Sequence, residues 1–339
     1  MKKLTGVIAL ILILGTVPAA ARQPLLSVEC HDRTDRTHNL NIRVEGEAAT
    51  GKFAFPAKDP KTLVVFAHGY GHKSDSWVDH MRKAAADHGV AAVTMDYRGT
   101  YADEEGNLRG WFVKEGAADM IAATKMFQKV CPSIVQTVLF GVSMGGNASG
   151  LALARASEEA NASGGPLYDY WFNVEGAVNV LETYAGASAL APVNEFAAFA
   201  KADIEDEMNG TFADDPEGYA DLAVVSHMDE IEASRVKGVV VVHGIEDGLV
   251  PYNQSRELVA LLRERDITTE SYTMVGKGQG EPGTTITGYS GNEGSPFAGH
   301  ASETSTTHVV MVTAFDRLWS LVDGDLIVPG YQEHIEPGI

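Results

Sequence analysis

Patterns typical of buried strands and of helices alternate along most of the chain. Short, continuous apolar runs, such as residues 62–67 and 90–95, are typical of parallel strands covered on both faces. The chain therefore predicts a parallel sheet with helices on both faces. Further strands are expected at 137–140, 168–174, 238–242 and 270–275, and helices at about 76–88, 114–130, 147–156 and 308–322, with one more starting at 253.

Two regions depart from this alternation. Residues 40–55 alternate between apolar and polar positions, which predicts one or two antiparallel strands at a sheet edge. Residues 182–232 contain Ala-rich and acidic helical pieces broken by Pro192, Asn209-Gly210 and Asp215-Pro216, which favours a helical cap inserted over the sheet. The expected domains are an N-terminal extension at 22–60, a core at 61–180 and 236–325, a cap at 181–235 and a tail at 326–339.

The first 21 residues have the features of a secretory signal peptide. Lys2 and Lys3 precede an apolar run at 7–14, and Pro18 and three alanines follow. The apolar run is shorter than the ~20 residues that a membrane-spanning helix needs. We therefore expect cleavage near Ala21 and a secreted protein, either extracellular or periplasmic.

Export changes the interpretation of the only two cysteines, Cys30 and Cys131. Outside the cytoplasm two cysteines commonly pair, so we expect a disulfide, worth about 3–5 kcal/mol by its effect on chain entropy. Two buried free thiols are the alternative. The sequence has no C-x-x-C motif and no His/Cys cluster, so no structural metal site is expected.

Charge narrows the range of partners. The chain has 26 basic and 46 acidic residues, a net charge of −20, which argues against nucleic acid and against a stable anchor on anionic membranes. Its length of 339 residues and its 45% hydrophobic content suit one large α/β domain with an insertion. Nothing in the sequence indicates an oligomeric state.

The most informative motif is the hexapeptide at 141–146, GVSMGG, which contains a G-x-S-x-G pattern. An apolar strand precedes it and a helix of small residues follows. Such a turn holds its serine in a strained conformation with the hydroxyl exposed for attack. Ser143 is therefore the candidate nucleophile.

Candidates for an acid and a base follow Ser143 in the chain. Asp247 comes just after the strand at 238–242, so it would share a sheet rim with Ser143, and Glu246 is its nearest competitor. For the base, His300 lies in a loop that can reach across the rim. His308 at a helix start and His334 in the tail are the alternatives.

Together, His68-Gly69, the 96–99 motif DYRG, the GVSMGG turn, His243-Gly244 through Asp247, and Gly299-His300 resemble an α/β-hydrolase over most of residues 61–322. The resemblance implies an eight-stranded, mostly parallel sheet and a triad of Ser143, Asp247 and His300. It also implies an oxyanion hole made by the backbone N–H groups of Tyr70 and Met144.

The chain is also similar to secreted lipases and polyester hydrolases, although these usually lack a large cap, and the Gly-rich insert between Val275 and His300 is a further departure. We expect a secreted serine hydrolase that cleaves small-molecule or polymeric carboxylic esters through an acyl-enzyme, without metal or cofactor. The alternatives are a prolyl-oligopeptidase-like serine peptidase and a non-catalytic binding protein with the same fold.

The signal peptide is directly testable. Because the signal peptidase site is expected near Ala21, N-terminal sequencing of exported protein should begin at or close to Arg22. An exported protein that still begins at Met1 would contradict the prediction.

Overall fold

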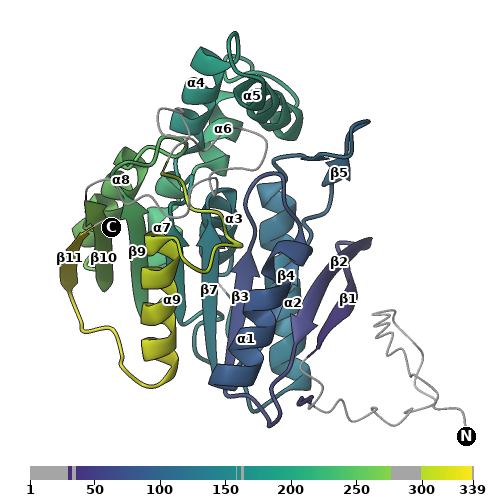
Figure 1. Cartoon of the computed structure of the whole chain (residues 1–339), viewed down its shortest axis with the longest axis vertical. Helices are drawn as coiled ribbons and strands as arrows, with labels where there is room; N and C mark the ends of the chain where they lie inside the picture. The colour runs from purple at the N-terminus through teal and green to yellow at the C-terminus, as the bar shows by residue number, and fades with distance from the viewer. Residues whose placement is uncertain (1–29, 33–35, 158, 162–163, 276–298, 338–339) are drawn as a thin grey trace, which may run out of the picture.

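The computed structural model describes residues 30–32, 36–157, 159–161, 164–275 and 299–337. The predicted signal peptide and residues 276–298 of the Gly-rich insert lie outside this part of the chain. Figure 1 shows one large central sheet with helices on both faces, as the sequence predicts. No helix in the described residues combines the length and the apolar character needed to cross a membrane.

The main sheet has nine strands among the described residues, in the order β1-β2-β4-β3-β7-β8-β9-β10-β11. The seven strands from β4 to β11 pair in parallel, and β2 pairs antiparallel with both β1 and β4. The strands are β1 Thr37–Val44, β2 Glu47–Ala54, β3 Thr62–Ala67, β4 Ala91–Met95, β7 Gln136–Val142, β8 Tyr170–Val174, β9 Gly238–Gly244, β10 Thr269–Val275 and β11 Tyr331–Pro337. A separate small hairpin joins β5 (Tyr101–Ala102) and β6 (Leu108–Arg109).

The expected count of eight strands was wrong, because part of the predicted tail forms β11. This strand pairs in parallel with β10 at the sheet edge. Its sequence, YQEHIEP, has no buried apolar face, so hydrophobic pattern does not identify it as a strand. Backbone pairing and side-chain stacking hold it instead: the His334 and Tyr272 rings stack at 4.4 Å, and the Arg263 guanidinium lies 4.3 Å from the Tyr331 ring centroid.

The parallel strands are buried on both faces because consecutive apolar side chains enter two different cores. In β3, Leu63 and Val65 pack in one cluster, whereas Val64 and Phe66 pack in the other. Helices α1 (Val78–His88) and α9 (Val309–Val322) cover the Phe66 face. Helices α2 (Val113–Val130), α3 (Met144–Arg155) and α8 (Asn253–Glu264) cover the other face.

Between β8 and β9 the chain forms helices α4 (Val180–Leu190), α5 (Glu195–Met208), α6 (Pro216–Leu222) and α7 (Met228–Ala233). Asn179, Asn194 and Asp215 each accept a backbone N–H bond at the start of a helix, as polar N-cap residues do. Helices α4 and α5 stand beyond the strand ends in Figure 1, apart from the layers that cover the sheet. We call α4 and α5 the cap helices; the domain boundaries given above stay a prediction.

The two cysteines form a disulfide, which confirms the predicted pairing. Cys30 and Cys131 are joined across a sequence separation of 101 residues, with their Cα atoms 5.7 Å apart. Cys131 is the C-cap residue of α2 and is fully buried. The bond therefore ties the first described residues to the end of the helix that leads into β7.

Removing this bond should destabilise the fold. Replacing both cysteines by Ala should lower the free energy of unfolding by about 2–5 kcal/mol. Ala is chosen over Ser so that no hydroxyl is buried in place of the sulfur atoms. Guanidinium chloride denaturation of the variant, and of the wild-type protein with and without dithiothreitol, measures the change. A midpoint that stays the same in all three samples would contradict the expectation.

Candidate active site

Ser143 occupies a tight turn between β7 and α3. Its backbone angles are φ 57° and ψ −126°, a strained conformation for a residue with a side chain. Neighbouring glycines make the turn possible: a Cβ on Gly141 would come within 2.2 Å of the Gly145 carbonyl oxygen, and one on Gly145 within 2.1 Å of the Ala67 oxygen. The structure thus places Ser143 in the strand-to-helix turn that the G-x-S-x-G pattern predicts.

The two amides predicted to form an oxyanion hole come from the start of α3 and from the loop after β3. Met144 is the first residue of α3, and Tyr70 lies in that loop. The loop runs close to the serine: a Cβ atom added to Gly69 would lie 3.5 Å from Ser143 Cβ. Gly69 already donates its own N–H to Glu303 Oε2 at 2.7 Å. The next amide, that of Tyr70, is therefore the candidate donor on this side.

The structure brings His300 and Asp247 together. His300 Nδ1 lies 2.7 Å from Asp247 Oδ2, and both side chains are buried. The other Asp247 oxygen accepts backbone N–H bonds from Leu249 at 2.8 Å and Val250 at 2.9 Å, which fixes the carboxylate. Glu246, the competing acid, is exposed.

The alternative histidines lie elsewhere. His308 is the N-cap of α9, and its Nδ1 accepts a bond from the Val310 N–H at 3.4 Å. His334 lies on β11 at the sheet edge, stacked on Tyr272. Gly299, directly before His300, has a backbone conformation that only glycine adopts easily. Its φ is 87°, and a Cβ there would lie 2.4 Å from the Glu246 carbonyl oxygen.

Sequence reasoning missed Glu175, a fully buried carboxylate next to His300. Its Oε2 lies 3.4 Å from His300 Nδ1 and accepts the Ala301 N–H at 2.6 Å. Burial and the nearby charge of Asp247 raise the pKa of Glu175 to about 7. A signal was available, because Glu175 directly follows β8 as Asp247 closely follows β9, at the same edge of the sheet.

Glu303 was also missed. It lies three residues after His300 and is 3% exposed. Its carboxylate accepts hydrogen bonds from the Gly69 N–H and the Ser76 hydroxyl, and its Oε1 lies 3.2 Å from His72 Nδ1. Burial acts to raise the pKa of Glu303, but the charge of His72 and these hydrogen bonds outweigh it and lower the pKa to about 2. Glu303 therefore stays negative and holds the Gly69 loop in place.

The acidic surroundings change the proton affinity of His300. Burial alone would lower its pKa, but the negative charges of Asp247, Glu175 and Glu303 outweigh burial and raise the pKa to about 9. Without substrate, the imidazolium form is therefore the major form at neutral pH.

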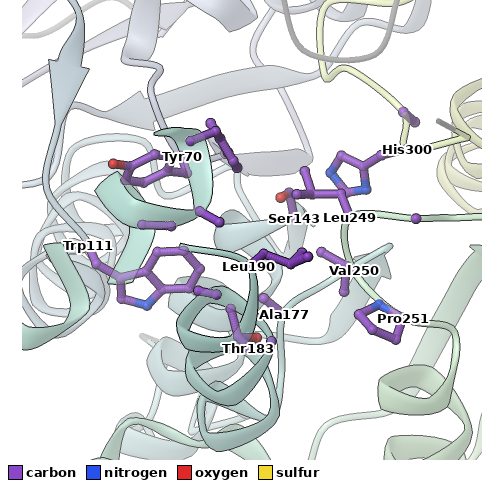
Figure 2. Close-up of a pocket in the computed structure, with 18 of the residues that line it drawn as sticks. Tyr70, Trp111, Ser143, Ala177, Thr183, Leu190, Leu249, Val250, Pro251 and His300 are labelled. Atoms are coloured by element: carbon purple, nitrogen blue, oxygen red, sulfur yellow. The ribbon is translucent and has the colours of Figure 1, made fainter. Parts of the chain in front are cut away.

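Ser143 and His300 open onto one pocket of about 170 Å³. In Figure 2, Ser143 lies between the Tyr70 and Trp111 rings on one side and His300 on the other. The rest of the lining is mainly apolar, with Leu190 from α4 and Leu249 from the loop that carries Asp247. An apolar group of a substrate fits this lining, with the reacting bond at Ser143.

Cap helix α5 is joined to the Tyr70 side of the pocket by the buried carboxylate of Asp203. This group accepts bonds from Arg109 Nε at 3.0 Å and Nη2 at 2.9 Å, from the Gly110 N–H at 2.9 Å, and from the Tyr70 hydroxyl. Burial and the Asp203 charge raise the pKa of Tyr70, so its hydroxyl remains a donor. Asp203 thus connects the cap helices to the loop that carries the candidate oxyanion donor.

Glu175, His243 and Asp247 also bring potential metal-ligand atoms within 4.8 Å of one another. Their atoms already have protein partners. His243 Nε2 faces the Val250 carbonyl at 2.9 Å and must carry its proton there, while Nδ1 lies 2.7 Å from Ser255 Oγ. The donor set therefore fits a hydrogen-bonded network and does not fit a bound metal ion.

A family model described as the prolyl oligopeptidase family matches residues 76–281. No curated protein matches the sequence.

Among solved structures, the chain is similar to a puromycin hydrolase (16% identity, TM-score 0.58, 90% of this chain and 41% of that one). It is also similar to an acylaminoacyl peptidase of Pyrococcus horikoshii (15%, 0.53, 70% and 36%) and to dipeptidyl peptidase 4 of Porphyromonas gingivalis (15%, 0.50, 70% and 31%). These likenesses show the fold, and the chain aligns with less than half the length of each of these proteins.

The Asp203 network yields a stability prediction. Asp203→Asn removes the nearer of two carboxylates that compensate Arg109 and should lower the free energy of unfolding by about 1.5–3 kcal/mol, the range for hydrogen bonds to charged groups. Urea denaturation measures the change. The matched control is Asp206→Asn, an exposed position on the same helix, where a change within about 0.5 kcal/mol is expected. Equal stability of the two variants would contradict the prediction.

Proposed function

Because the chain belongs to the prolyl oligopeptidase family, we propose that it is a serine hydrolase that acts through Ser143, Asp247 and His300. One observation carries this proposal. A serine in a strained strand-to-helix turn and a buried histidine bonded to an aspartate line the same pocket. This is the arrangement that nucleophilic catalysis by serine requires.

In the proposed mechanism, neutral His300 takes the Ser143 proton at Nε2 as Oγ forms a bond to the substrate carbonyl carbon. The electron pair of the C=O double bond moves to oxygen, where the Tyr70 and Met144 N–H groups stabilise the negative charge. The imidazolium then protonates the leaving group as its bond to carbon breaks, and an acyl-enzyme remains. Water, deprotonated by His300, attacks the acyl carbon, and as the bond from that carbon to Ser143 Oγ breaks, the imidazolium returns its proton to Oγ and the acid is released.

Asp247 has two tasks in this sequence. Its bond to Nδ1 holds the ring in the tautomer that presents Nε2 to Ser143, and its charge stabilises the imidazolium.

Because the pKa of His300 is raised to about 9, the neutral base is the minor form at pH 7. Activity on a substrate without ionisable groups should therefore rise from neutral to alkaline pH.

For the bond that is cleaved, the family match supports an amide or peptide bond, the alternative in the sequence analysis, better than the carboxylic ester proposed there first. Both reactions form the same acyl-enzyme and differ in the leaving group, because an amine must be protonated as it departs. We therefore propose a peptidase with an apolar acyl-side pocket, and esters as a second class of substrate.

We also propose that the protein works outside the cytoplasm. The Cys30–Cys131 bond supports this, since disulfides persist in oxidising compartments.

The activity is tested with a matched ester and amide that carry the same apolar acyl group and the same chromophore. Wild type should hydrolyse both, and Ser143→Ala should reduce kcat by a factor of about 10⁴ or more. The ratio of kcat/KM for amide and ester ranks the two substrate classes.

A fluorophosphonate probe separates catalysis from mere binding. It should label wild type and not Ser143→Ala, because phosphonylation requires an activated serine. A folded wild-type protein that is neither labelled nor active would refute the proposed function and leave a non-catalytic binding protein.

A further inference from the structure

His300 has two carboxylates at the same ring nitrogen. Its Nδ1 lies 2.7 Å from Asp247 Oδ2 and 3.4 Å from Glu175 Oε2, and both carboxylates are completely buried. The mechanism proposed above uses only Asp247. A second buried acid at this distance changes the electrostatic energy of the imidazolium and offers its N–H another acceptor.

Glu175 is held in place by the backbone of two neighbouring segments. Its Oε1 accepts the Gly244 N–H at 3.2 Å, and its Oε2 accepts the Ala301 N–H at 2.6 Å. Ala301 follows His300, so Glu175 fixes the loop that carries the base. The residue also has φ 46°, a conformation that side-chain-bearing residues rarely adopt. The fold thus maintains this carboxylate at a local conformational cost.

The charged groups around Glu175 favour its interaction with His300. Asp247 repels the ionised form of Glu175, whereas His300 and His243 attract it. Because burial and Asp247 raise the pKa of Glu175 to about 7 and the pKa of Asp247 is lowered, Glu175 is the more readily protonated of the two carboxylates. Replacing Asp247 by an uncharged residue would remove the repulsion and leave Glu175 as the anion beside the ring.

We propose that Glu175 is a positioning residue for His300, which orients and charges the imidazole together with Asp247 and takes the place of Asp247 when that residue is replaced by an uncharged one. This inference rests on the proposed function of Ser143 and His300. The site then has two acids, Asp247 and Glu175, and either of them can orient and charge His300.

The test compares Asp247→Asn, Glu175→Gln and the double variant, using the ester substrate and the fluorophosphonate probe. In serine hydrolases with one acid, its change to the amide costs about 10⁴-fold in kcat. Here Asp247→Asn should cost only about 10²-fold, and adding Glu175→Gln should bring the loss to about 10⁴-fold. The two changes are then coupled, as expected for groups that act on one ring.

The pH profile separates positioning from a purely structural role. Glu175→Gln removes a negative charge beside His300, so the alkaline rise of kcat/KM should move to a pH about one unit lower. The low-field proton resonance of His300 Nδ1–H should persist in Asp247→Asn and disappear in the double variant. Glu264→Gln, an exposed change of the same type on α8, is the control and should leave both readouts unchanged.

The outcomes are distinct. The inference is overturned if Asp247→Asn alone loses about 10⁴-fold and the double variant loses no more. It is also overturned if Glu175→Gln lowers the melting temperature without moving the pH profile. If a double variant does not fold, the pH profile and the proton resonance of the single variants decide. A wild-type protein without activity or labelling would refute the proposed function itself.

Discussion

The candidate site depends on the burial of three carboxylates at one edge of the sheet. Burying a carboxylate is costly unless hydrogen bonds or opposite charges compensate it. Each of Glu175, Asp247 and Glu303 is compensated by backbone N–H groups, and Glu175 and Glu303 reach segments far away in the sequence. The same bonds that make burial possible therefore fix the loops after β3 and β9 and the loop of His300. The hydrogen bonds to the buried carboxylates thus both position His300 and hold these loops together.

Much of the fold and of the candidate site follows from short-range patterns in the sequence. Buried parallel strands are recognisable because both faces need apolar side chains, as in β3 and β9. Ser143 is recognisable because only glycines fit at 141 and 145, where backbone segments approach within 2.1–2.2 Å of a Cβ position. Asp247 and His300 follow from chain order and from the shared rim. Where each of these residues sits is determined mainly by its own turn.

Other parts could not be read from the sequence because they depend on contacts between distant segments. Glu303 looks like an ordinary polar loop residue until the Gly69 amide is seen 2.7 Å from its carboxylate. Asp203 lies in an acidic helix and differs from its neighbours through partners far away in the sequence, such as Arg109, 94 residues earlier in the chain. The polar strand β11 is stabilised by its partner β10 and has no buried apolar face of its own, so no local pattern marks it.

The position of β11 has a consequence for behaviour in concentrated solution. Strand β10, TESYTMV, is rich in β-forming residues, and as an edge strand it would present unpaired backbone groups to any extended chain. With β11 in place, the outermost strand carries Glu333 and Glu336 instead. A second copy approaching edge to edge would bring these like charges together. The polar last strand thus protects the protein against aggregation through this edge of the sheet.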